Sequence, residues 1–164
     1  GGTPNTDSLW YRKPFNNFGD YRWQCTWYCK GRVGEVLRIN LNVTGNAGDW
    51  TGTYSSTANR VDANGNATGQ TVTVHKETSG SNPRSGSVAV FKFWVSDGLG
   101  NADYFGHVLY VERVANGRVY YSDSYKRRES VVFADMTIGE FYTQYDGRDL
   151  PAGANSAFKG YLYV

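Results

Sequence analysis

The chain contains one segment whose apolar residues have the spacing of a helix, followed by a long series of strand-like segments. This order limits the folds that the chain can adopt. Between residues 23 and 37, large apolar residues recur every three or four positions, which predicts an amphipathic helix. After residue 70, short β-branched and aromatic runs alternate with turns rich in Gly, Asn and Ser, a pattern typical of strands. We therefore expect one α+β domain over residues 1–164, with residues 1–17 as an N-terminal arm.

Charge and composition exclude several classes of function. The formal net charge is +2, and the basic residues are dispersed apart from the run Lys126-Arg127-Arg128, so we expect no nucleic-acid partner. No apolar run approaches the roughly 20 residues of a membrane-spanning helix. With two Cys and two His, the chain has too few ligands of the right kind for a closed zinc site, so we predict no metal and no cofactor. We expect a monomer.

A cysteine lies where the helical run begins. Cys25 would sit near the positive end of the helix dipole, which favours the thiolate form and is typical of a nucleophile. Cys29 follows one turn later, a separation at which a disulfide is geometrically awkward, so we expect two thiols with Cys29 packed inward. Because glycine weakens a helix interior, we expect this helix to end or bend near Gly34.

Two further segments carry structural expectations. Residues 55–69 are rich in Ser, Thr, Asn and Gly, and we expect an exposed loop there. His75 lies in a polar alternation and is expected to face solvent without a role. His107 follows Gly106 at the start of a strongly apolar strand, where a strand end can meet a cleft, so it is the candidate base for a cysteine nucleophile.

A catalytic histidine needs a third group that orients it, and Asp123 is the candidate. His107 and Asp123 lie on the two strands of a predicted hairpin. If residues 115–117 form a three-residue loop between these strands, the two residue numbers of each cross-strand pair sum to 232, and Asp123 lies on the same face as His107. A two-residue loop at 116–117 makes the sum 233 and places Asp123 on the opposite face. The proposed chemistry therefore requires the three-residue loop, and Gly117 suits its last position.

Four blocks of the sequence resemble the successive signature blocks of the CHAP domain, the cysteine, histidine-dependent amidohydrolase/peptidase family. They occur in the family's order: Gln24-Cys25-Thr26-Trp27-Tyr28, Gly45-Asn46-Ala47-Gly48-Asp49-Trp50, Pro83-Arg84-Ser85-Gly86-Ser87-Val88-Ala89-Val90-Phe91 and Gly106-His107-Val108-Leu109-Tyr110-Val111-Glu112. The resemblance implies a papain-like α+β fold, with N-terminal helices packed on a mostly antiparallel sheet. It also implies a cysteine hydrolase that cuts amide bonds of peptidoglycan without a cofactor.

The resemblance assigns roles to individual residues. Cys25 matches the family nucleophile and His107 its general base, while Asp123 falls where the family usually has an acidic or amide residue, commonly Glu. For the oxyanion of the tetrahedral intermediate we expect the backbone N–H of Cys25 and the Gln24 side chain as donors. The chain thus carries a complete candidate Cys-His-Asp site.

Three aromatic residues are the candidates for contacting substrate. Tyr104 and Tyr125 flank His107 and its partner strand, and Trp27 follows Cys25 on the helix, although a place in the core is the commoner role for such a tryptophan. The run 126–128 is usually a solvated edge, but beside the active face it would attract an acidic wall polymer.

These features together predict one function and leave two alternatives. We expect a peptidoglycan hydrolase of the endolysin kind, either an N-acetylmuramoyl-L-alanine amidase or an endopeptidase of the peptide stem or cross-bridge. Such an antimicrobial, wall-lysing enzyme would be secreted or phage-derived, act at the bacterial cell wall, and work with a wall-binding domain outside this chain. The alternatives are a secreted papain-like cysteine protease or transamidase toxin, and a non-catalytic wall-binding module.

Overall fold

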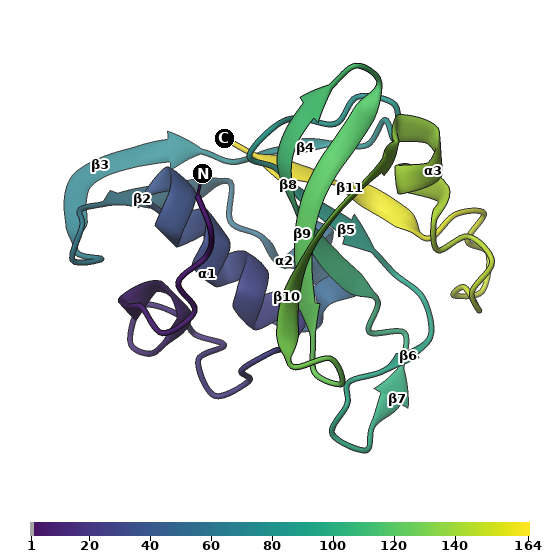
Figure 1. Cartoon of the computed structure of the whole chain (residues 1–164), viewed down its shortest axis with the longest axis horizontal. Coiled ribbons are helices and arrows are strands. Elements are labelled where there is room, and N and C mark those ends of the chain that lie inside the picture. Colours follow the sequence, from purple (N-terminus) through teal and green to yellow (C-terminus); the bar gives the residue numbers. More distant parts are fainter. Residues whose placement is uncertain (1) are drawn as a thin grey trace.

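A six-stranded antiparallel sheet with a long helix against one face organises the molecule (Figure 1). The computed structural model describes residues 2–164. The strand order in the sheet is β10-β9-β8-β5-β11-β4, and every neighbouring pair is antiparallel. The expected α+β class with a mostly antiparallel sheet is confirmed.

The helical elements are few and short apart from α1. They are η1 (Leu9–Tyr11), α1 (Cys25–Leu37), η2 (Ala47–Asp49), α2 (Trp50–Thr53) and α3 (Ile138–Thr143). The strands are β1 (Ile39–Asn40), β2 (Thr57–Val61), β3 (Ala67–Thr73), β4 (His75–Glu77), β5 (Val88–Phe91), β6 (Val95–Ser96), β7 (Ala102–Asp103), β8 (His107–Ala115), β9 (Arg118–Tyr125), β10 (Ser130–Thr137) and β11 (Phe158–Tyr163).

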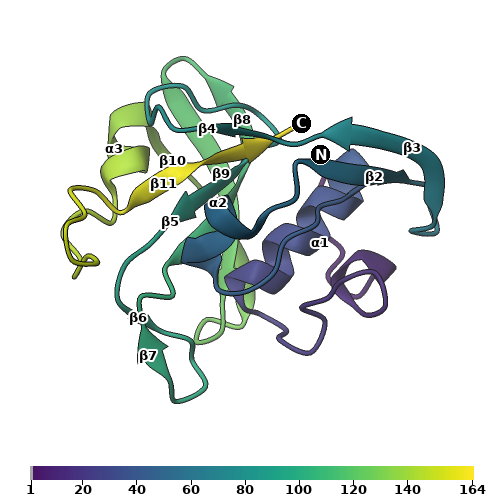
Figure 2. The same cartoon turned by 180° about the vertical axis from the view of Figure 1, so that it is seen from behind.

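The two faces of the sheet pack against different partners because successive side chains of a strand point to opposite sides. On β8, Val108 and Tyr110 join the cluster that includes the α1 residues Trp27 and Val33. Leu109 and Val111 join a second cluster, which includes Phe141 of α3. In Figure 2, the view from behind, α1 lies to one side of β5 and β11, and α3 lies to the other. Both faces of the central strands are therefore buried.

Helix α1 continues through the position where we expected it to end. It runs to Leu37, and its C-cap, Arg38, takes the left-handed conformation. A Cβ atom on Gly31 would lie 2.2 Å from a ring carbon of Tyr11, and one on Gly34 would lie 2.6 Å from the ring of Phe15. The glycines therefore let the N-terminal arm pack closely on the helix, and this contact offsets their low helix propensity.

The prediction of a loop at residues 55–69 is wrong. Its first part forms β2, which pairs with β3, and only residues 62–66 form the connecting turn. The polar composition concealed a strand because only two of its five residues, Ala58 and Val61, are buried. With β1, the hairpin makes a second, three-stranded sheet.

The turn between β8 and β9 also differs from the prediction. Ala115 pairs with Arg118, so the loop has two residues, Asn116 and Gly117, with φ of 54° and 72°. Positive φ at both central positions is the geometry that Asn-Gly favours in two-residue hairpins. The preference of Asn-Gly for a two-residue turn therefore explains why the predicted three-residue loop does not form.

A β-bulge at Glu112 compensates for the shorter turn. Val111 pairs with Tyr121, whereas Arg113 pairs with Tyr120, so Glu112 has no partner on β9. An extra residue in one strand changes the register beyond it. Paired numbers sum to 233 near the turn and to 232 beyond the bulge. Asp123 therefore lies on the face of His107, as expected, but the bulge achieves this and the loop does not.

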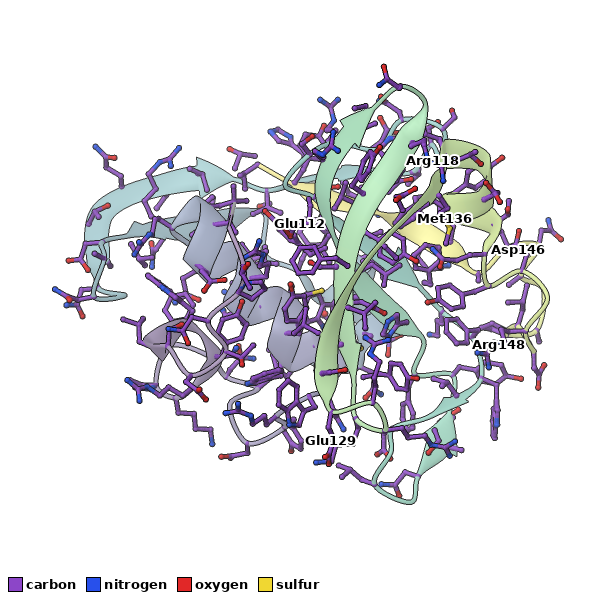
Figure 3. The ribbon with its side chains drawn as sticks, in the orientation of Figure 1. Glu112, Arg118, Glu129, Met136, Asp146 and Arg148 are labelled. Atoms are coloured by element: carbon purple, nitrogen blue, oxygen red, sulfur yellow. The ribbon has the colours of Figure 1, made fainter. Side chains whose placement is uncertain are left out.

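The bulged residue is also the main polar connection between the hairpin and α1. Figure 3 shows Glu112 on the side of the hairpin that faces the helix. Its carboxylate accepts two hydrogen bonds from Arg32, at 3.0 and 2.6 Å, and one from the Ser122 hydroxyl at 3.0 Å. Arg32 also donates to Glu35 at 2.8 Å. The Arg32 side chain is only 1% exposed, so this ion pair is buried.

We predict that Glu112→Gln destabilises the protein strongly. Glu112→Gln leaves the buried Arg32 guanidinium with the partly compensating charge of Glu35, so we expect a loss of up to about 3–5 kcal/mol of unfolding free energy, the range typical when one partner of a buried ion pair is removed. The matched control is Asp135→Asn, because Asp135 pairs with Arg118 where both side chains are about 40% exposed; such surface pairs contribute about 0–1 kcal/mol. Urea denaturation of both variants measures the difference, and equal losses would contradict a structural role for the buried pair.

Candidate active site

Cys25 occupies the first residue of α1, as the sequence predicted. Gln24 before it is extended, and Trp23 has a φ of 74°, which a non-glycine residue rarely adopts. The Ser124 hydroxyl donates to the Trp23 carbonyl at 2.8 Å and fixes this turn. Because the first backbone N–H groups of a helix lack intrahelical acceptors, the N–H of Cys25 is available to an oxyanion at this place.

Because successive side chains of β9 point to opposite sides, this strand contacts both α1 and His107. Ser122 and Ser124 face α1, where they bond the Tyr28 hydroxyl at 2.7 Å and the Trp23 carbonyl. Asp123, between them, faces the other way and reaches His107. All three β9 residues are buried. The run Ser-Asp-Ser thus holds the cysteine-bearing helix and the histidine from one strand.

His107 and Asp123 form a short, buried hydrogen bond. His107 Nε2 lies 2.7 Å from Asp123 Oδ2, and each residue is 8% exposed. This contact leaves Nδ1 as the ring nitrogen for Cys25, with which the imidazole also interacts. The other carboxylate oxygen of Asp123 accepts from Arg128 at 3.0 Å, and the same guanidinium donates to the Asp123 carbonyl at 2.9 Å. Both oxygens of Asp123 are therefore occupied by cationic donors.

These contacts determine the protonation of the histidine. Burial alone would lower the pKa of His107, but the adjacent Cys25 side chain and the bonded Asp123 carboxylate outweigh it and raise the pKa to about 10. Burial would raise the pKa of Asp123, but its bonds to His107 and Arg128 lower it below its usual range. The site thus favours an imidazolium at His107 that is paired with the Asp123 carboxylate.

A cavity of about 1110 Å³ opens onto Cys25 and His107. Its rim includes four exposed large hydrophobic side chains: Tyr21, Trp94, Leu99 and Tyr125. Six such side chains are exposed among the described residues, so most of them gather at this opening. Exposed apolar groups concentrated around a cleft are typical of a binding site.

The remaining residues predicted for the site take different places. Gln24 lines the cavity, and one N–H of its amide donates to the Asp97 carbonyl at 3.0 Å, which leaves the other for a ligand. Tyr125 lines the cavity and is 43% exposed. Tyr104 does not line it but contacts Trp94, which does, with ring centroids 5.2 Å apart.

Trp27 does not fit the role of substrate contact. It is 1% exposed, and its indole N–H donates to the Tyr11 carbonyl at 2.6 Å. Its ring belongs to the core beneath the N-terminal arm, so the expectation that it binds substrate is corrected. Cys29 is fully buried, and both cysteines are free thiols.

Sequence analysis missed two residues of the site. Arg128 was treated as part of a solvated basic run, but Glu129 takes a positive φ of 51° in the turn after β9, and Arg128 folds back onto Asp123. Tyr145 comes from the segment after α3, and its ring meets the His107 ring edge to face at 6.0 Å. No local pattern signals either contact, since both depend on the tertiary fold.

The described residues contain neither a metal-binding cluster nor a membrane-spanning helix. Within residues 2–164, no group of three or more His, Cys, Asp and Glu side chains is arranged to hold a metal ion. No helix in this part of the chain has the length and apolar character needed to cross a bilayer.

Comparisons with known proteins identify a family and a similar solved structure. The sequence model described as "CHAP domain" matches residues 16–124. Among solved structures, "The crystal structure of Ly7917" aligns with a TM-score of 0.47 and 14% sequence identity, covering 85% of this chain and 52% of that chain. The chain therefore spans about half the length of that solved chain. No curated protein matches it.

We predict that the His107 imidazole titrates far above the ordinary value of about 6.5, with a pKa of about 10 in the wild type. Cys25→Ala removes a neighbour that raises the pKa of His107, so this pKa falls in the variant, while the bond to Asp123 keeps the ring in place. NMR titration of the ring signals measures both values, and His75→Gln assigns the two histidines. A His107 pKa near 6.5 that Cys25→Ala leaves unchanged would contradict the coupled site.

Proposed function

This chain belongs to the CHAP domain family, and we propose that it is a cysteine amidohydrolase that cleaves amide bonds of bacterial peptidoglycan. Membership of this family is typical of hydrolases that act on peptidoglycan as amidases or peptidases. The observation that carries the specific proposal is the 2.7 Å bond between His107 and Asp123 beside a cysteine at a helix start.

In the proposed reaction Cys25 is the nucleophile. An imidazolium at His107 holds the Cys25 thiolate, and Asp123 orients the ring and stabilises its charge. The sulfur attacks the carbonyl carbon of the scissile amide and forms a tetrahedral oxyanion. The free helix N–H of Cys25 and the second N–H of the Gln24 amide then donate to that oxygen, and one such donor contributes about 3 kcal/mol to the transition state.

The same imidazolium completes the cycle. His107 gives its proton to the leaving amine, which breaks the C–N bond and leaves a thioester on Cys25. The neutral imidazole then takes a proton from water, which hydrolyses the thioester and restores the thiolate and imidazolium. Arg128 contacts no reacting atom in this scheme and acts as a positioning residue through Asp123.

The shape of the cleft agrees with a polymeric substrate. The cavity is open at the surface, and aromatic side chains such as Trp94 and Tyr125 stand at its rim. We propose that the protein acts at the bacterial cell wall after secretion or as part of a phage lysis system. The bond cut is an amide, either between muramic acid and the first stem residue or within the peptides.

We predict that purified peptidoglycan loses turbidity with the wild type and not with Cys25→Ala. Loss of the nucleophile lowers the rate by at least about 10³-fold. Mass spectrometry of the fragments and labelling of new amino termini identify the bond. The matched control is Cys29→Ala, which removes a thiol one helical turn away that is fully buried, and it keeps the activity.

Two results would contradict the proposal. Fragments that persist in Cys25→Ala would show that another group performs the cleavage. Intact walls of every chemotype, together with cleavage of a protein or acyl transfer to an amine, would favour a cysteine protease or transamidase instead. Wall binding without any cleavage would favour a binding module.

A further inference from the structure

One wall of the cleft comes from a part of the chain outside the family match. The segment after α3, residues 144–157, follows the matched range of 16–124 and contributes Tyr145 and Arg148 to the cavity lining. Its anchor is Asp146, whose carboxylate accepts from the Ser156 hydroxyl at 3.1 Å and from the Ala157 N–H at 2.9 Å. The segment is therefore a fixed part of the site.

A stack of side chains connects Arg148 to the catalytic histidine. The guanidinium lies 5.5 Å from the centre of the Phe93 ring, Phe93 stacks on Tyr145 at 4.5 Å, and Tyr145 meets His107. The Asp149 carbonyl also accepts from the Trp94 N–H at 2.8 Å and fixes the chain beyond Arg148. Figure 3 shows Arg148 in the loop after α3, on the other side of the hairpin from Glu112. Arg148 is therefore held at a defined place along the cleft.

The charge balance of the cleft favours an anionic ligand. Four Lys or Arg side chains line the cavity: Lys126, Arg127, Arg128 and Arg148. The acids that line it are Asp97 and Asp123, and both are engaged, Asp97 by its own loop and Asp123 by His107 and Arg128. Of the four cations, only Arg128 has a carboxylate partner within residues 2–164. The other three are available to a bound substrate.

We propose that Arg148 is a specificity-determining residue that binds a carboxylate of the substrate, so that the enzyme prefers amide bonds in carboxylate-bearing peptides or glycopeptides. This inference rests on the proposed amidohydrolase function. A guanidinium presents paired donors that match a carboxylate, and its contact with Phe93 limits its freedom before binding. Lys126 and Arg127, in the turn between β9 and β10, add a general positive potential to the cavity.

The experiment compares one peptidoglycan in two forms. Amino groups of the purified wall are acetylated, and half of the material is then converted with carbodiimide and ammonia, so that carboxylates become carboxamides of nearly equal size. Initial rates of new amino termini give kcat/KM for both forms. Because charge-assisted hydrogen bonds are stronger than neutral ones, we expect the wild type to prefer the carboxylate form about tenfold or more.

Three variants separate Arg148 from a general charge effect. Arg148→Gln reduces the preference to near unity by raising KM for the carboxylate form. Arg148→Lys keeps part of the preference because the charge remains. Arg60→Gln removes an equal charge from an exposed residue outside the cavity and keeps the full preference.

The outcomes distinguish this inference from the proposed function. Equal cleavage of both forms by the wild type, or a preference that survives Arg148→Gln, overturns the role of Arg148 and leaves the amidohydrolase function in place. Cleavage of neither form by the wild type overturns both.

Discussion

The buried ion pair between Arg32 and Glu112 connects the two halves of the candidate site. Arg32 lies seven residues after Cys25, about two turns along α1, and Glu112 lies five residues after His107 on β8. Because Glu112 is the bulged residue, its contact with the helix is made at the point where the strand register changes. The register beyond that point brings Asp123 to His107. One pair of charges therefore couples the position of the nucleophile to the alignment of its base.

Much of this arrangement could be predicted from the sequence, because local signals were strong. The helical period and the cysteine at its start identified α1, and the apolar strand after Gly106 identified His107. The alignment of Asp123 was predicted correctly from a wrong loop. Turn chemistry is local, and Asn-Gly formed the two-residue turn it favours. The bulged residue Glu112 makes its ion pair with Arg32, which is distant in sequence, and no local pattern shows this contact.

Other differences between prediction and structure also arise from tertiary contacts. Gly34 weakens a helix in isolation, but the rings of Phe15 and Trp10 need the space that it leaves. Arg128 and Tyr145 reach the site through a turn and a C-terminal segment whose folded paths depend on distant residues. Trp27 was predicted as a candidate contact because it is near Cys25 in sequence, yet two residues along a helix lead to another face, which here is the core.

The coupling between Cys25 and His107 determines the chemistry of the site, and the alkylation rate of Cys25 by iodoacetamide at pH 6 measures it without any assumption about substrate. An isolated thiol with a pKa of about 8.5 is almost fully protonated at that pH and reacts slowly. We expect iodoacetamide to label the wild type at Cys25 and not at the buried Cys29. We also expect a rate at least about tenfold above that of His107→Ala. Equal rates in the two proteins would contradict the coupling of Cys25 to His107.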